Sequence, residues 1–160
     1  MARSMDELLE ELCREHFPYP PATRDEIEQF EHRVSWRLDA DLRAFYLRCN
    51  GAELFKPLPN APYQILPLSE IVRARVAMRG EDDERWGPAS IYVLCDVQDG
   101  DYALLDVGQR EEGRHPLVDG YHEAWPDPAY RRRIARSFSE FLDQALRSEG
   151  RIFYLQPARE

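Results

Sequence analysis

Residues 23–51 read TRDEIEQFEHRVSWRLDADLRAFYLRCNG, the most clearly specified stretch of the chain. Thr23 and Glu26 have the spacing of a capping box, in which each side chain satisfies a backbone N–H at the start of a helix. Apolar residues then recur at intervals of three and four, first for one helix and then for a second. They are Ile27, Phe30 and Val34, followed by Leu38, Leu42, Phe45, Tyr46 and Cys49. The stretch therefore predicts two short amphipathic helices.

Start and stop signals frame these and other helices. Asp39 is a favourable N-cap residue for the second helix. Asn50-Gly51 is expected to end that helix, because both residues tolerate the left-handed backbone found at many helix C-termini. Further capping-box patterns at residues 4–7 and 137–140 predict an N-terminal helix and a C-terminal helix. The N-terminal helix should stop near His16, before a proline-rich linker.

The middle of the chain has the pattern of strands. Residues 91–95 and 102–107 are apolar nearly throughout and flank residues 98–101, QDGD, a good hairpin turn. The hairpin is therefore expected in the middle of a sheet that is covered on both faces. The other expected elements are short strands at 63–66 and 116–118, a helix with Ser69 as its N-cap, and a last strand or packed tail at 151–155. Helices, then neighbouring strands, then a helix indicate an α+β fold with a central, largely antiparallel sheet and flanking helices.

Length and charge restrict the class of protein. At 160 residues the chain fits a single domain, residues 1–160, that is large enough to bury a core. Acidic residues outnumber basic residues by 30 to 21, which gives a formal net charge of −9. Such a charge repels nucleic-acid phosphate and attracts a basic partner. We expect a cytoplasmic protein, because the sequence shows neither a signal peptide nor an apolar run long enough to cross a membrane.

Candidate metal and catalytic motifs fail when they are tested. Aspartates crowd around the hairpin, but placing Gly100 at the invariant glycine of a calcium loop puts Cys95 and Val97 at the first two ligand positions. Of the histidines only His115 and His122 are near each other, and they flank a short strand bounded by loop. The three scattered cysteines indicate reduced core thiols. We expect no catalytic residue, no metal ion, no cofactor and no enzyme activity.

Two acidic stretches are candidates for binding a partner. The run Glu81-Asp82-Asp83-Glu84 is either a solvated loop or a docking surface for a basic protein. Trp86 and Trp125 favour docking, since aromatic side chains beside charge are typical of interface centres, although each also fits a core position. Asp99 and Asp101, in the hairpin turn, complete the predicted partner-binding set.

One basic cluster stands out in this acidic chain, Arg131-Arg132-Arg133 with Arg136. It could meet phosphate. We favour the other reading, in which these arginines form a solvated face or pair with nearby acids.

Taken in order, these pieces resemble the SUKH superfamily over about residues 23–147. The matching residues are Glu26-Ile27 with Phe30-Glu31, Leu38 through Leu42 with Phe45, Asn50-Gly51, Leu66 through Ile71, Gly100 through Asp106, Pro116-Leu117-Val118, and Phe138 with Phe141-Leu142. Two positions depart from the pattern: the family often has proline where Asp39 stands and glycine where Ala52 stands. Asp39 is a sound N-cap, so the departures leave the fold intact and the subfamily open.

The resemblance implies a SUKH-like α+β fold, no enzyme activity and a role in binding other proteins. The best-known bacterial members are immunity proteins encoded beside polymorphic toxins. We therefore expect an immunity protein, or antitoxin, that inhibits a cognate toxin by direct contact, for example a nuclease with a basic surface. The alternative is a regulatory or scaffold module of the same fold with no toxin partner. Neither the oligomeric state nor the binding face follows from the sequence.

Overall fold

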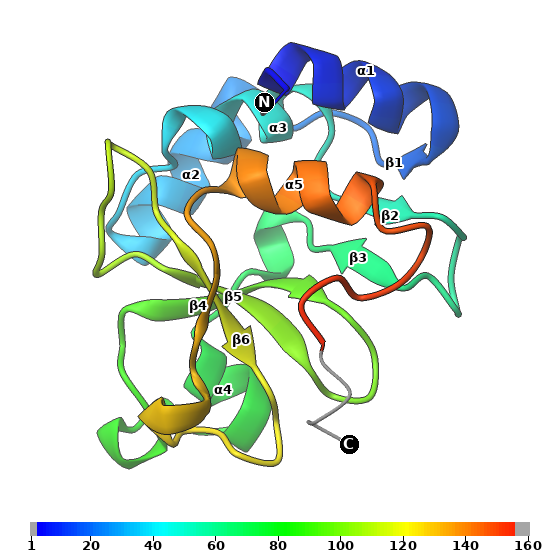
Figure 1. The fold of residues 1–160 in the computed structure, drawn as a ribbon. Helices are drawn as coiled ribbons and strands as arrows, with labels where there is room; N and C mark the ends of the chain where they lie inside the picture. Colours follow the sequence, from blue (N-terminus) through cyan, green and yellow to red (C-terminus); the bar gives the residue numbers. More distant parts are fainter. Residues whose placement is uncertain (1–2, 156–160) are drawn as a thin grey trace.

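The structure is a computed structural model of the chain and describes residues 3–155 (Figure 1). The α-helices are α1 (Met5–Glu15), α2 (Arg24–Val34), α3 (Ala40–Arg48), α4 (Ala74–Arg79) and α5 (Phe138–Leu146). Single 3₁₀ turns are η1 (Leu68–Glu70), η2 (Glu84–Trp86) and η3 (Pro128–Tyr130). The strands are β1 (Phe17–Pro18), β2 (Ala52–Leu54), β3 (Tyr63–Ile65), β4 (Ile91–Asp96), β5 (Tyr102–Asp106), β6 (Leu117–Gly120) and β7 (Arg133–Ala135).

The strands form one antiparallel sheet in which each strand pairs with the next along the chain. β4 and β5 are central in this order, as their nearly continuous apolar sequence predicts. Residues 91–95 and 103–105 are all buried. The prediction of an α+β fold with a central antiparallel sheet is confirmed.

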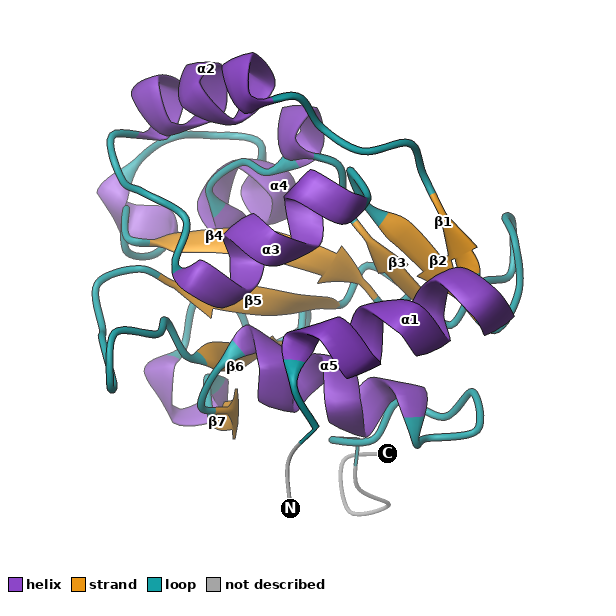
Figure 2. Ribbon diagram, turned by 90° about the horizontal axis from the view of Figure 1, so that it is seen from above, coloured by secondary structure: helices purple, strands orange, loops and turns teal. Residues whose placement is uncertain are grey.

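Helices cover the two faces of the sheet unequally. α1, α3 and α5 contact one another and lie together on one face (Figure 2). Their aromatic residues interlock, since the Phe45 ring of α3 lies 5.0 Å from the Phe138 ring of α5. Tyr63 of β3 reaches the same layer, 6.2 Å from Phe141. The short helix α4 lies against β4 on the opposite face (Figure 1).

The predicted helix starts are present. Both halves of the capping boxes at residues 4–7 and 23–26 form. At the start of α5 only half of the box forms, because Ser137 accepts the Glu140 N–H while the Glu140 carboxylate accepts the N–H of Arg136 instead. These caps satisfy donors that would otherwise be orphaned in the first helical turn.

The helix expected from Ser69 is wrong. Ser69 lies within the single turn η1, and the α-helix begins only at Ala74. The residues between them are extended beside β4, where the Val93 N–H donates to the Val72 carbonyl at 2.9 Å. A sheet contact from a distant strand therefore overrides the local helical pattern.

α3 stops directly before Asn50-Gly51, as expected, but the expected left-handed cap does not form. The C-cap is Cys49, in an extended conformation. Asn50 instead accepts the Leu68 N–H on its side-chain oxygen at 2.9 Å. Gly51 has a φ of +98°, and an added Cβ would lie 2.7 Å from the Ile65 carbonyl oxygen. The glycine is needed for this close approach between β2 and β3.

Three strands, β1, β2 and β7, were not predicted. Each has only two or three residues, too few to show an alternating pattern. Residues 151–155 are a packed tail and not a strand, with the Phe153 ring 5.6 Å from the Phe141 ring.

Candidate partner-binding surface

The acidic run at 81–84 lies in the loop between α4 and β4, and its centre is held by arginines of the same chain. Asp82 accepts hydrogen bonds from Arg75 Nε at 2.7 Å and from an Arg73 guanidinium nitrogen at 2.9 Å. The hydrogen bond from Arg75 is the main reason that the pKa of Asp82 lies below its usual value. The negative charge of Asp82 is therefore largely neutralised by two arginines of the same chain.

Two further acids of the run, Glu81 and Asp83, are paired as well. Arg85 approaches Glu81 at 3.2 Å and Asp83 at 3.5 Å. Asp83 also accepts the Arg85 backbone N–H at the start of η2. Within the described chain, Glu84 is the one member of the run that forms no ion pair. The structure thus leaves less unpaired charge in this loop than its sequence indicates.

The two tryptophans play different structural parts. Trp125 is only 5% exposed, and its Nε1 donates to the Trp86 carbonyl at 2.8 Å. Arg131 lies over its ring, 5.6 Å from the ring centre. Trp125 therefore joins two loops from inside the fold. Trp86 is partly exposed and donates to Glu81 at 3.2 Å, so it lies at the surface beside the run.

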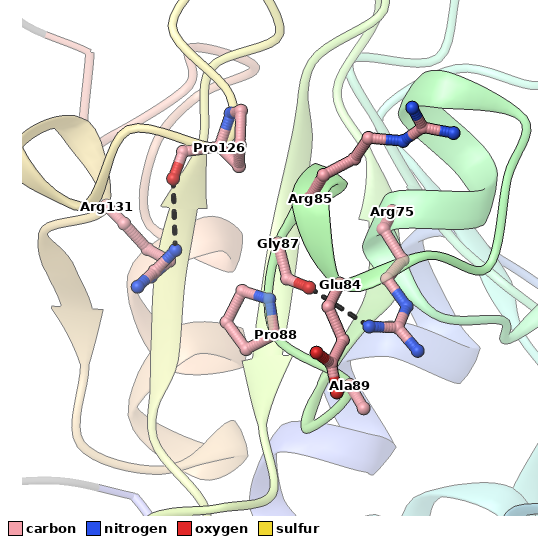
Figure 3. Close-up of a pocket in the computed structure, with 8 residues that line it drawn as sticks. All are labelled: Arg75, Glu84, Arg85, Gly87, Pro88, Ala89, Pro126 and Arg131. Atoms are coloured by element: carbon pink, nitrogen blue, oxygen red, sulfur yellow. Dashed lines mark hydrogen bonds between the residues drawn. The ribbon is translucent and has the colours of Figure 1, made fainter.

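A cavity of about 450 Å³ opens between these loops (Figure 3). Its charged lining consists of Arg75, Arg85, Arg131 and Glu84. Arg75 donates to the Gly87 carbonyl at 3.1 Å and Arg131 donates to the Pro126 carbonyl at 3.4 Å. Two of the three guanidinium groups are therefore hydrogen-bonded to the backbone. The lining contains no histidine, cysteine or serine, and therefore no pairing of a nucleophile with a histidine base.

The two predicted aspartates of the hairpin lie apart from the run, in the turn between β4 and β5. Asp101 accepts the His122 N–H at 2.9 Å and lies 2.6 Å from His122 Nδ1. Asp99 is exposed at the tip of the β4–β5 hairpin. Arg79 of α4 donates to the His122 carbonyl at 2.9 Å, which holds this segment to α4. Glu84 of the run and Asp99 of the hairpin line different cavities. The predicted residues thus form two clusters and not one.

Three polar residues in neighbouring strands were not predicted from the sequence as part of a site: Glu53 of β2, Gln64 of β3 and Asp96 of β4. They lie in adjacent positions of neighbouring strands. Asp96 is one of several aspartates around the hairpin and has no distinguishing sequence pattern, and Glu53 lies in a strand too short to predict. No sequence signal links residues 53, 64 and 96 before the register is known.

The basic cluster pairs with acids, as predicted. Arg132 lies 3.5 Å from Asp119, and Arg136 lies 3.2 Å from Glu140. Arg133 pairs with Glu111. These contacts pair three of the four arginines with carboxylates of the same chain, whereas Arg131 donates to the Pro126 carbonyl and lies over the Trp125 ring.

The thiols are in apolar surroundings. Burial raises the pKa of Cys49 to about 12 and the pKa of Cys95 well above its usual value, which keeps both protonated. Across residues 3–155, no group of three or more His, Cys, Asp or Glu residues is placed to hold a metal ion. The described helices also include none that is long and apolar enough to span a bilayer.

Comparison with protein-family models gives a match over most of the chain. Residues 21–144 match the SMI1 / KNR4 family (SUKH-1). The matched region begins just before α2, includes the whole sheet from β2 to β7, and ends within α5. No curated protein matches the chain.

Proposed function

The chain belongs to the SMI1 / KNR4 family (SUKH-1), and from this premise we propose that it is an immunity protein that binds and inhibits a cognate bacterial polymorphic toxin. Membership of the family fits an interaction module, and the match over residues 21–144 is the observation that carries the proposal. The inhibition would come from direct contact between the two proteins in the cytoplasm. The chain would need neither a cofactor nor catalytic activity of its own.

Charge supports a basic partner. The net charge of −9 would accelerate encounter with a positively charged surface, such as the substrate-binding surface of a nuclease. Because that attraction acts between exposed charges, salt should weaken it. The same charge disfavours direct binding of DNA or RNA.

Co-expression with the product of the adjacent gene tests the proposal. We expect that product alone to arrest growth, and the chain to restore growth and to co-purify with it. A matched control is Phe138→Asp, which places a charge in the fully buried α5 core and should abolish rescue.

Two results would contradict the proposal. If growth stays arrested while the folded chain is present, the chain does not inhibit that toxin. If the adjacent product is harmless on its own, the alternative applies, a regulatory or scaffold module of the same fold with no toxin partner.

A further inference from the structure

A row of polar side chains crosses four neighbouring strands. The pairing register places Glu53 of β2 opposite Gln64 of β3, Gln64 opposite Asp96 of β4, and Asp96 opposite Tyr102 of β5. Residues directly opposite one another in paired strands point to the same face of a sheet. We call Glu53, Gln64, Asp96 and Tyr102 the polar row.

The polar row faces away from the main helical layer. Side chains alternate between faces along a strand. Tyr63 contacts Phe141 of α5, so the adjacent Gln64 points to the opposite face. Figure 1 shows α4 beneath the strand β4 and no helix beneath β2 and β3, among the residues that the structure describes. This half of the sheet face is therefore not covered by a helix.

Glu53 gives the row a negative charge that no cation of the described chain neutralises. Its side chain is almost buried, with the residue 6% exposed. The carboxylate accepts hydrogen bonds from the Tyr19 hydroxyl at 2.8 Å and from the Leu58 N–H, both neutral donors. Burial, together with this hydrogen bond and the charge of Glu53, raises the pKa of Tyr19 to about 12. The carboxylate adds negative charge to this half of the sheet face, although it does not itself line the cleft that opens beside the row.

A cleft of about 420 Å³ opens beside the row, between the β2–β3 loop and the hairpin tip. We call it the hairpin cleft and define it by Leu58, Pro59, Gln64, Asp96 and Asp99, which line it. Leu58 is 56% exposed and forms an apolar wall. The two loops are tied together, because the Gln98 side chain donates to the Ala61 carbonyl at 2.7 Å.

The acids of the hairpin cleft differ from those of the run at 81–84. Three of the four acids in the run pair with arginines of the chain. Asp96 accepts the Gln98 backbone N–H at 2.8 Å and, like Asp99, forms no ion pair with a described residue. Burial is the main cause that raises the pKa of Tyr102 in the row. The negative charges of Asp96 and Glu70 raise it further. Both acidic side chains that line the cleft are therefore free of ion pairs with described residues, and they lie beside an apolar wall.

We propose that the hairpin cleft binds a lysine or arginine side chain of a partner protein that docks beside the polar row. The apolar stem of that side chain packs against Leu58 and Pro59, and its cationic head pairs with Asp96 and Asp99. Partner and cleft are complementary in charge and in apolar character. The identity of the partner as a toxin rests on the proposed function, whereas the chemistry of the cleft does not.

Replacing carboxylates by amides of the same shape distinguishes binding at the cleft from binding at the acidic run. Asp96→Asn with Asp99→Asn removes two charges, keeps the side-chain oxygen that caps the Gln98 N–H, and suits the φ of +57° at residue 99, which asparagine tolerates. The matched control, Glu81→Gln with Glu84→Gln, removes two charges from the run. Each pair changes the net charge equally, so a difference between them reports position and not total charge.

The first test uses the tripeptide amide acetyl-Arg-Arg-Arg-NH₂ and backbone amide NMR at low salt. We expect the largest shifts at Gln64, Asp96, Gln98 and Asp99. The affinity should fall about tenfold in the cleft variant, because both carboxylate partners are lost, and change less than about twofold in the control. Absence of binding, shifts centred on residues 81–86, or equal losses in both variants would overturn the proposal.

The second test uses the complex from co-expression. Weaker co-purification by the cleft variant than by the control supports the cleft as the docking site. Weaker co-purification by the control than by the cleft variant would exclude the cleft as the docking site, and the proposed function would be unaffected. If the unmodified chain forms no complex, the proposed function fails, and the tripeptide titration alone decides whether the cleft binds basic side chains.

Discussion

Arg75 Nε lies 2.7 Å from Asp82 Oδ1, so the centre of the most acidic run in the chain is an internal ion pair. The Arg75 side chain is only 8% exposed, whereas Asp82 is half exposed. The same guanidinium donates to the Gly87 carbonyl and thereby fastens the loop between α4 and β4 to α4. The sequence indicates that this run is a docking surface, but in the fold one of its acids helps to hold a loop in place.

Replacing Arg75 by methionine should destabilise the fold by about 2 kcal/mol, because the Gly87 carbonyl and Asp82 lose a buried donor. Arg85→Met is the matched control. Its side chain is 65% exposed, so loss of its ion pairs should cost less than about 1 kcal/mol. Urea unfolding at pH 7 measures both free energies. Equal losses in the two variants would mean that Arg75 does not hold the loop.

Gly87→Ala should destabilise the protein more than Gly80→Ala. Gly80 has φ 75° and ψ 3°, the left-handed region that alanine enters at a modest cost, whereas Gly87 has φ 117° and ψ 174°, a region almost confined to glycine. Backbone strain therefore adds to the cost at Gly87. At Gly80 an added Cβ meets nothing within 4 Å, whereas at Gly87 it would lie 2.5 Å from the Trp125 ring. We expect a difference of about 1–3 kcal/mol in thermal or urea unfolding. Similar values for both variants would contradict the packing of Trp125 beneath Gly87.

The thiols should react in two classes. Cys13 is partly exposed, while Cys49 and Cys95 are buried and have raised pKa values. In the native protein a disulfide reagent should modify Cys13 alone, and in urea all three thiols. Cys13→Ser should abolish the native reaction. Fast modification of that variant would show that a buried thiol is accessible.

Stability should fall as the pH rises above about 9. Burial raises the pKa of Cys49 from 9.0 to about 12, and the pKa values of Tyr19 and Tyr63 from 10.0 to about 12. The folded state therefore holds these protons more tightly than the unfolded state, and the unfolded state is favoured as they are released. The contribution is fully present below the unfolded-state pKa values and is lost towards pH 12. Urea midpoints from pH 7 to 11 measure it, and midpoints that stay constant over this range would refute it.

Local signals predicted the helices well. The caps at Ser4, Thr23 and Asp39 and the apolar spacing behind them depend on residues within one or two turns. The central hairpin followed from two long apolar strands around one turn. The same local reasoning failed after Ser69, where pairing with β4 decides the backbone.

The candidate site was less predictable, because it depends on contacts between distant segments. Burial of Trp125 requires its packing against Gly87, which lies far away in the sequence. The polar row requires the register of β2 and β3, and each has three residues. Neutralisation of Asp82 requires the Arg75 side chain of α4 to reach the loop that follows this helix. Charges can be counted in a sequence, but their partners appear only once the chain is folded.

Titration of the purified chain into the purified product of the adjacent gene tests the central claim most directly, with heat of binding and toxin activity followed together. We predict a saturable complex, weakened by salt, in which toxin activity falls in step with the fraction bound. Full toxin activity in the presence of excess folded chain would contradict the account.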